Sequence, residues 1–112
     1  MKYALLVYNE PGDIAGLPEG EREEVSRKYW AVRDLPGVLD GAHLHGIDAA
    51  TTVRVQDGKT LTTDGPFADT KEVFGGYYVL EADDLDQAIA TASQVPSTWM
   101  GGSVEIRPIV EA

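Results

Sequence analysis

Val73-Phe74-Gly75-Gly76-Tyr77-Tyr78-Val79-Leu80-Glu81 carries apolar side chains at both alternating positions of a predicted strand. Residues 2–8, Lys-Tyr-Ala-Leu-Leu-Val-Tyr, show the same two-sided pattern. A strand that is apolar on both faces is normally covered on both faces. The two segments therefore predict central strands of a buried sheet. The Gly75-Gly76 pair weakens a strand and indicates a bulge or a close backbone approach.

Two segments have helical patterns. Residues 18–35 begin with Pro18 and several Glu, and the stretch ends before Pro36-Gly37. The second helix begins after Asp84, whose capping-box partner is Gln87. The predicted buried stripes contain Val25, Tyr29 and Val32 in the first helix, and Leu85, Ala88, Ile89, Ala92 and Val95 in the second.

Residues 51–56 and 59–63 alternate β-branched and polar side chains, and Asp57-Gly58 joins them. This arrangement predicts a tight hairpin. Residues 38–48 are either a strand or an extended connection, and residues 103–110 form a last strand. The order β-α-β-(β)-β-α-β predicts an α+β, ferredoxin-like domain over residues 1–112, an antiparallel sheet with two helices on one face.

Two helices cover only one face of such a sheet. We therefore expect a second copy to cover the other face about a two-fold axis, giving a homodimer.

Nine Lys and Arg against nineteen Asp and Glu give a net charge of −10, which disfavours nucleic acid and anionic membranes as partners. The chain has no cysteine and no apolar run long enough to span a bilayer, so we expect a cytoplasmic protein.

The nine residues Asp64-Gly65-Pro66-Phe67-Ala68-Asp69-Thr70-Lys71-Glu72 resemble the motif of the YCII-related family in its DGPF branch. The resemblance implies a dimeric α/β barrel with a cleft between subunits. Most members of this branch have no assigned activity, and relatives are often encoded near, or fused to, extracytoplasmic-function sigma factors. Another branch has a His–Asp dyad with its His on the first helix. Residues 18–35 contain no His, so that dyad is not carried over.

Asp64 is the first candidate for chemistry. In a cleft its carboxylate would serve as a general base, whereas in an ordinary turn it would bind backbone N–H groups. Lys71 could bind an anionic ligand or pair with a surface carboxylate. Phe67 is either a core plug or a pocket wall.

His43 and His45 are the two histidines, and an extended 42–47 would place both on one face. Each is a candidate proton carrier near neutral pH. Two His are too few for a metal site, so no metal is expected. Nucleotide-binding glycine motifs are also missing from the sequence, so no cofactor is expected.

Tyr8, Tyr77 and Tyr78 stand on the predicted central strands, where a Tyr opposite the helices would line the cleft between subunits or simply pack there. Arg54 could bind a carboxylate or pair with nearby acidic groups.

The leading hypothesis is a protein of unassigned activity that binds a small molecule or a protein partner at the cleft between subunits. One alternative is an enzyme that uses Asp64, with His43 or His45, for proton transfer on a small organic substrate. The other is an accessory module of a sigma factor.

Overall fold

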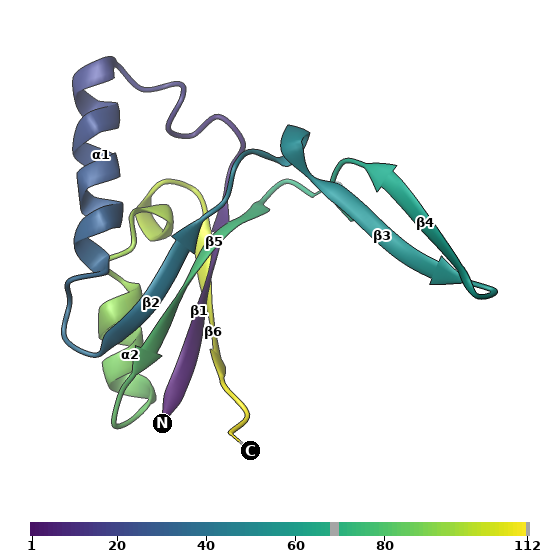
Figure 1. Ribbon diagram of the computed structural model, residues 1–112. Helices are drawn as coiled ribbons and strands as arrows, with labels where there is room; N and C mark the ends of the chain where they lie inside the picture. The colour runs from purple at the N-terminus through teal and green to yellow at the C-terminus, as the bar shows by residue number, and fades with distance from the viewer. Residues whose placement is uncertain (68–69, 112) are drawn as a thin grey trace.

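The computed structural model describes residues 1–67 and 70–111. Its elements follow the order strand, helix, strand, hairpin, strand, helix, strand (Figure 1). They are β1 (Lys2–Asn9), α1 (Glu19–Val32), β2 (Val38–His43), β3 (Thr51–Gln56), β4 (Lys59–Asp64), β5 (Val73–Glu81), α2 (Leu85–Ala92) and β6 (Ser103–Pro108), with 3-10 turns at Ile47–Ala49 and Pro96–Trp99.

Four strands form an antiparallel sheet in the order β2-β5-β1-β6. This order, with both helices on one face, is the ferredoxin-like arrangement, and the predicted fold class is confirmed (Figure 1). The open question about residues 38–48 is settled in favour of a strand over Val38–His43. No helix within residues 1–67 and 70–111 is long and apolar enough to cross a membrane.

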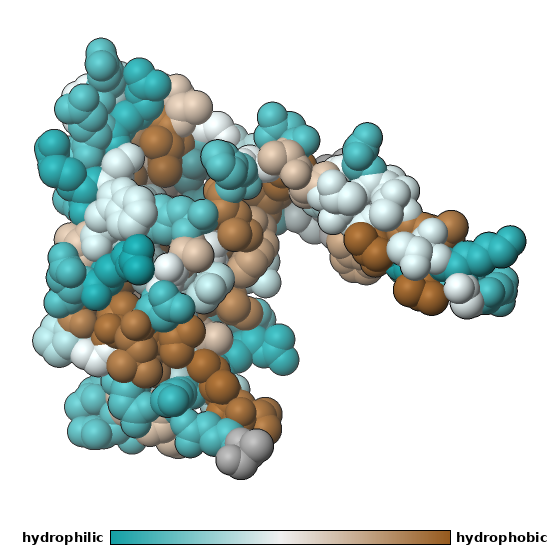
Figure 2. Space-filling model, viewed as in Figure 1, coloured by the Kyte–Doolittle hydropathy of each residue, from teal (hydrophilic) through white to brown (hydrophobic). Residues whose placement is uncertain are grey.

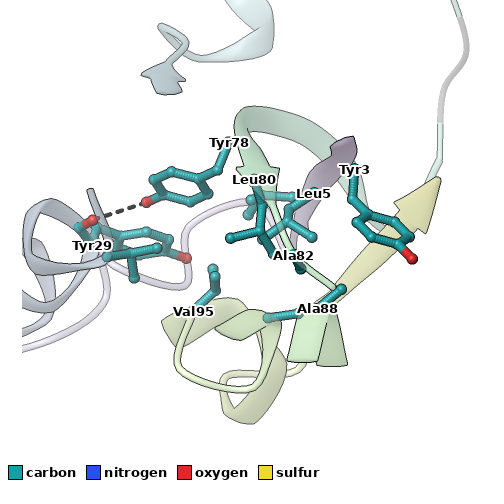
Figure 3. Close-up of a cluster of buried hydrophobic side chains, with 11 residues drawn as sticks. Tyr3, Leu5, Tyr29, Tyr78, Leu80, Ala82, Ala88 and Val95 are labelled. Carbon is teal, nitrogen blue, oxygen red and sulfur yellow. Dashed lines mark hydrogen bonds between the residues drawn. The ribbon is translucent and has the colours of Figure 1, made fainter. Parts of the chain in front are cut away.

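The core lies between the sheet and the helices. Alternate residues of β1 and β5 point toward the helices and are buried, and the helices contribute a matching set of apolar side chains (Figure 3). The burial of these side chains is the main source of stability in a domain of this size. They are Tyr3, Leu5 and Val7 of β1, Tyr78 and Leu80 of β5, Tyr29 and Val32 of α1, and Ala88 and Ala92 of α2 with Val95.

The opposite face of the sheet has no helix over it (Figure 1). On this face the side chains of β1 and β5 alternate with the buried ones and are only partly exposed, because neighbouring strands shield one another. Those of the central strands are mainly apolar, whereas the edge strand β6 adds charges. We call this surface the open face: Ala4, Leu6 and Tyr8 of β1, Tyr77 and Val79 of β5, and Glu105 and Arg107 of β6.

The predicted hairpin is present, and Asp57 (φ 52°) and Gly58 (φ 74°) form its turn with the two positive φ angles of a type I′ turn. It does not join the main sheet. Strands β3 and β4 pair only with each other and project from the body on the side of the open face (Figure 1). The radius of gyration is 15.7 Å, against about 13 Å for a compact chain of this length. We call residues 51–64 the arm.

The predicted bulge is also confirmed, since the β1–β5 register passes from Val7↔Gly76 to Tyr8↔Phe74 and skips Gly75. At the start of α2 the Asp84 carboxylate accepts a hydrogen bond from the Gln87 backbone N–H at 2.9 Å, as predicted. The predicted buried stripe of α2 is partly wrong. Leu85 and Ile89 are exposed, because this eight-residue helix faces the sheet with its alanine edge.

Candidate functional site

A cavity of about 270 Å³ lies between α1 and the sheet, at the end where β1 leads into the 10–17 loop. We call it the inner cavity. One wall comes from α1, another from the end of β2, and the floor from β1 and β5. The side chains that carry its chemistry are aromatic, imidazole and acidic: Tyr29, Trp30, His43, His45, Tyr78, Glu10, Asp13 and Asn9.

His43 ends β2 and lies among three aromatic rings. Its ring stacks on Trp30 with centroids 5.0 Å apart and planes inclined by 22°. Tyr29 and Tyr78 meet it edge to face at 5.2 and 6.1 Å. The imidazole is therefore held in one orientation by aromatic contacts on more than one side.

A hydrogen-bonded chain connects His43 with the core. The Tyr78 hydroxyl donates to the backbone carbonyl of Tyr29 at 2.9 Å, and His43 Nε2 lies 3.1 Å from the same hydroxyl oxygen (Figure 3 draws the first bond). A carbonyl only accepts, so the hydroxyl proton is committed to Tyr29. The Tyr78 oxygen must then accept a hydrogen bond from the N–H group at His43 Nε2. In the neutral ring Nδ1 is consequently the nitrogen without a proton.

Two causes favour the neutral form of His43. Partial burial among the aromatic rings lowers the pKa of His43 below its ordinary value of 6.5, and the positive charge of Arg33 lowers this pKa further. Arg33 lies over the Trp30 ring, with its guanidinium carbon 5.5 Å from the ring centroid. His43 is thus an uncharged base at neutral pH, with a fixed tautomer.

Both tyrosines of this cluster remain protonated. Burial raises the pKa of Tyr78 well above its ordinary value, and the neighbouring Tyr29 raises it further. Burial also raises the pKa of Tyr29, against the opposing effect of the hydrogen bond from Asn9 Nδ2, which is 2.9 Å long. The tyrosines therefore act as fixed hydrogen-bonding groups.

Two glycines make room for this arrangement. Gly41 lies opposite Tyr78 in the β2–β5 register, and a Cβ at Gly41 would come 2.6 Å from Tyr78 Cδ1. A Cβ at Gly76 would come 2.6 Å from the backbone oxygen of Ala42. Any larger side chain at either position would displace the strand or the Tyr78 ring that supports His43.

The charges that line the inner cavity are negative. Glu10 and Asp13 contribute carboxylates, and no Lys or Arg is among its described lining residues. Asp13 accepts hydrogen bonds from Asn9 Nδ2 at 3.4 Å and from the Ile14 backbone N–H at 2.7 Å. The cavity therefore favours neutral or positively charged ligands over anions.

A second cavity, of about 640 Å³, lies where the arm meets the end of the sheet. We call it the corner cavity. Tyr8 and Phe74 of the sheet, with rings 5.7 Å apart, form one side, and Pro66 and Phe67 at the base of the arm form another. His45 lines both cavities.

The predicted site residues fall into separate groups. His43, His45 and Tyr78 meet at the inner cavity, whereas Tyr8 and Phe67 line the corner cavity. Tyr78 is buried on the helix side of the sheet, in alternation with Tyr77. It is therefore not the Tyr opposite the helices that could line a cleft between subunits.

The remaining predicted residues lie at the arm or beside it. Asp64 ends β4, is exposed, and lines neither cavity. The Arg54 guanidinium lies over the Phe67 ring at 4.9 Å. Lys71 Nζ lies 3.9 Å from the Glu10 carboxylate, and both are at the surface. Ala68 and Asp69 of the nine-residue motif lie outside the described residues. No group of three or more metal-ligating side chains occurs in the described ranges.

Sequence reasoning did not identify Trp30, Asn9 and Asp13 as site residues. Trp30 is exposed and follows Tyr29, which is buried in α1 together with Val32. The available signal for Trp30 was therefore a second aromatic residue next to a buried one. Asn9 ends β1 and Asp13 lies in the loop that follows. The path of this loop beside the sheet is a tertiary feature that local sequence patterns do not encode.

Comparisons with known proteins show the family and the fold of the chain. The family model of the YCII-related domain matches residues 1–112. An uncharacterised protein of Rhizobium meliloti strain 1021 is 36% identical over 117 residues, which cover 97% of this chain and 92% of the relative. A 5-chloro-2-hydroxyhydroquinone dehydrochlorinase of Burkholderia phenoliruptrix, solved in complex with 2,5-dihydroxybenzoquinone, has the same fold. Its TM-score is 0.55 at 15% identity, covering all of this chain and 96% of the solved one.

Proposed function

The chain belongs to the YCII-related family, and from this premise we propose that it binds a small ring-shaped organic molecule in the inner cavity and accepts a proton from it at His43 Nδ1. The nine-residue match at 64–72 further supports a place in the DGPF branch. This proposal moves the base from Asp64 to His43, because His43 lines the cavity and Asp64 does not.

One observation carries the proposal. The hydrogen-bonded chain from the Tyr29 carbonyl through the Tyr78 hydroxyl fixes the proton of His43 on Nε2. Protonation at Nδ1 leaves the Nε2–Tyr78 bond intact, so the ring can gain and lose a proton without moving. A general base needs such a fixed orientation and a neutral form at the working pH, and His43 has both.

The walls of the inner cavity indicate the class of ligand. A flat ring makes favourable contacts with aromatic side chains such as Tyr29 and Trp30, and the carboxylates of Glu10 and Asp13 disfavour anions. A neutral ring with a hydroxyl group meets both conditions. The solved dehydrochlorinase of the same fold was captured with an oxygenated six-membered ring, which agrees with this class.

The test is a nuclear magnetic resonance titration with hydroquinone, which is neutral, and benzoate, which is an anion of similar size. We expect hydroquinone to shift the Trp30 indole and His43 ring signals and benzoate to shift them little. Trp30→Ala should weaken binding about threefold to tenfold, the value of one aromatic contact. Trp99→Ala is the matched control, because Trp99 is exposed to a similar degree (52% against 55%) and lies outside the cavity.

Equal effects of the two Trp substitutions would contradict the assignment of the site. Nitrogen-15 spectra of the ring test the proposed base separately. They should show Nε2 protonated and Nδ1 unprotonated in the free protein, and the Nδ1 signal should move when hydroquinone binds. The reverse tautomer would rule out His43 Nδ1 as the proton acceptor.

We also propose that the protein is a homodimer in which a second copy covers the open face. Leu6, Tyr77 and Val79 make this face apolar at its centre, and no helix lies over it. Light scattering across a dilution series tests this proposal, and a folded monomer at micromolar concentration would contradict it.

A further inference from the structure

The arm exposes apolar side chains that nothing in its own chain covers. Val53 and Val55 share one face with Thr60 and Thr62, and the two valines are 59% and 70% exposed. A two-stranded hairpin is at best marginally stable alone in water. The valine face of the arm is therefore a surface that is complete only when another molecule packs on it.

The other face of the arm is partly occupied already. Arg54 and Leu61 are paired there across the strands, and Arg54 lies over Phe67 at the base of the arm. The two faces thus differ, and among the described residues the valine face carries the more exposed apolar side chains.

The distribution of charge favours a second copy of this chain as the occupant. The whole chain carries a net charge of −10, but the arm contains two basic residues, Arg54 and Lys59, and two acidic ones, Asp57 and Asp64. The arm is therefore neutral, and the remainder of the chain holds the entire excess of negative charge. A neutral, apolar arm can approach an acidic body of the same kind with little repulsion.

The geometry points to the same occupant. The arm leaves the body on the side of the open face, so the arm and the open face form the two sides of one angle (Figure 1; the space-filling view in Figure 2 shows the recess between them). One molecule placed in this angle covers both. By two-fold symmetry, the arm of the second molecule then lies against the body of the first molecule.

We propose that each arm lies with its valine face along the body of the partner copy, and that the partner closes the corner cavity at the inside of the angle. This inference rests on the proposed homodimer and extends it, because the open face alone would not require the arm. The corner cavity is then a site made by two copies, lined by Tyr8, Phe74 and Phe67 and shut off from solvent only in the dimer.

The first experiment shortens the arm without changing its register or turn. Removing residues 54–55 together with 60–61 deletes two paired steps, keeps Val53 opposite Thr62, and preserves Asp57-Gly58. We expect sedimentation to show a dimer at least tenfold weaker, with unchanged helical circular dichroism, since the arm pairs with no strand of the body. The full-length variant Val53→Thr/Val55→Thr keeps the shape of the arm and should weaken the dimer in the same direction.

The second experiment locates the arm directly. Protein with benzophenone-alanine at position 55 is mixed with nitrogen-15-labelled protein of the same sequence, irradiated and digested. We expect peptides that join arm and body to carry both isotopes. The matched control position is 61, on the opposite face, which should give fewer such peptides.

The outcomes separate the two proposals. A dimer that survives shortening unchanged, or crosslinks confined to one chain, overturns the arm contact and leaves the sheet-to-sheet homodimer standing. A chain that is monomeric with its arm intact overturns both. Neither result affects ligand binding in the inner cavity, which the Trp30 and His43 experiments test independently.

Discussion

The arm and the central strands β1 and β5 are all antiparallel strands that carry valine or leucine, but these side chains have opposite surroundings. Val53 and Val55 alternate with polar residues as in many sheet strands, yet they are exposed, whereas Leu5 and Leu80 are fully buried. Both regions contain antiparallel strand pairs with a defined register. The difference shows that a strand pattern specifies pairing and register, whereas burial depends on which other elements lie against the strand.

The largest expected difference is in the free energy of unfolding, between removal of a leucine side chain from the body and removal of one from the arm. Leu5→Ala should lower the free energy of unfolding by about 2–5 kcal/mol, because it opens a cavity beneath both helices. Leu61→Ala should cost less than about 0.5 kcal/mol, because Leu61 is already 45% exposed. Urea unfolding of both variants, followed by circular dichroism, measures the two values under monomeric conditions. Similar losses would mean that the arm is part of the cooperative core.

Tyr78→Phe should have the next largest effect. It removes the hydroxyl that donates to the Tyr29 carbonyl and accepts from His43, at a cost of about 1–2 kcal/mol. Tyr8→Phe is the control, because Tyr8 stands on the other face of the sheet and no hydrogen bond to its hydroxyl is found among the described residues. Thermal unfolding gives the stabilities. Loss of the Nε2-protonated tautomer of His43 in Tyr78→Phe would confirm the role of the hydroxyl, and an unchanged tautomer would contradict it.

A smaller, local effect is expected at the tip of the arm. Gly58 has a φ of 74°, so Gly58→Ala places a side chain in the left-handed region of backbone conformation. This should destabilise the arm by about 1 kcal/mol. Hydrogen exchange of the β3–β4 amides should accelerate about fivefold, because that energy is a factor of about five in the opening equilibrium. Amides of β1 and β5 should keep their rates. A change in those rates would show coupling between arm and body within one chain.

The smallest effect concerns the titration of His43. Its pKa in the folded chain is lowered from 6.5, so the folded state prefers the neutral ring. This preference contributes stability above pH 6.5 that is lost as the pH falls through the lowered pKa. Arg33→Gln removes the nearby positive charge and should raise the pKa of His43 toward its ordinary value. A proton NMR titration measures it, with Arg27→Gln as the matched control. Equal shifts in the two variants would exclude a specific role for Arg33.

Local signals in the sequence predicted the order of elements, the Asp57-Gly58 turn, the Gly75 bulge and the cap at Asp84. Each depends on residues that are close in the chain and on backbone conformations that few residue types accept. Separation of the arm from the sheet could not be predicted in this way. The alternation of Val53 and Val55 is the same for a strand that joins a sheet and for one that projects from it.

The candidate site was predicted only in part, for a related reason. His43 was selected for its chemistry, but its tautomer depends on Tyr78, thirty-five residues away, and on the Tyr29 carbonyl. Asp64 was selected from its motif, and the structure places it at the arm, where it lines neither cavity. Residue type indicates which groups can carry a proton, whereas the tertiary fold decides which of them meet a ligand.

Because Trp30 stacks on His43, the fluorescence of Trp30 can report on the state of His43. An indole in contact with an imidazole changes its emission when the imidazole becomes charged, and the two rings are 5.0 Å apart. The other indole, Trp99, lies beside Lys28 instead. In a Trp99→Phe background, tryptophan fluorescence would therefore follow the charge of His43 and the filling of the cavity beside it, without any attached label.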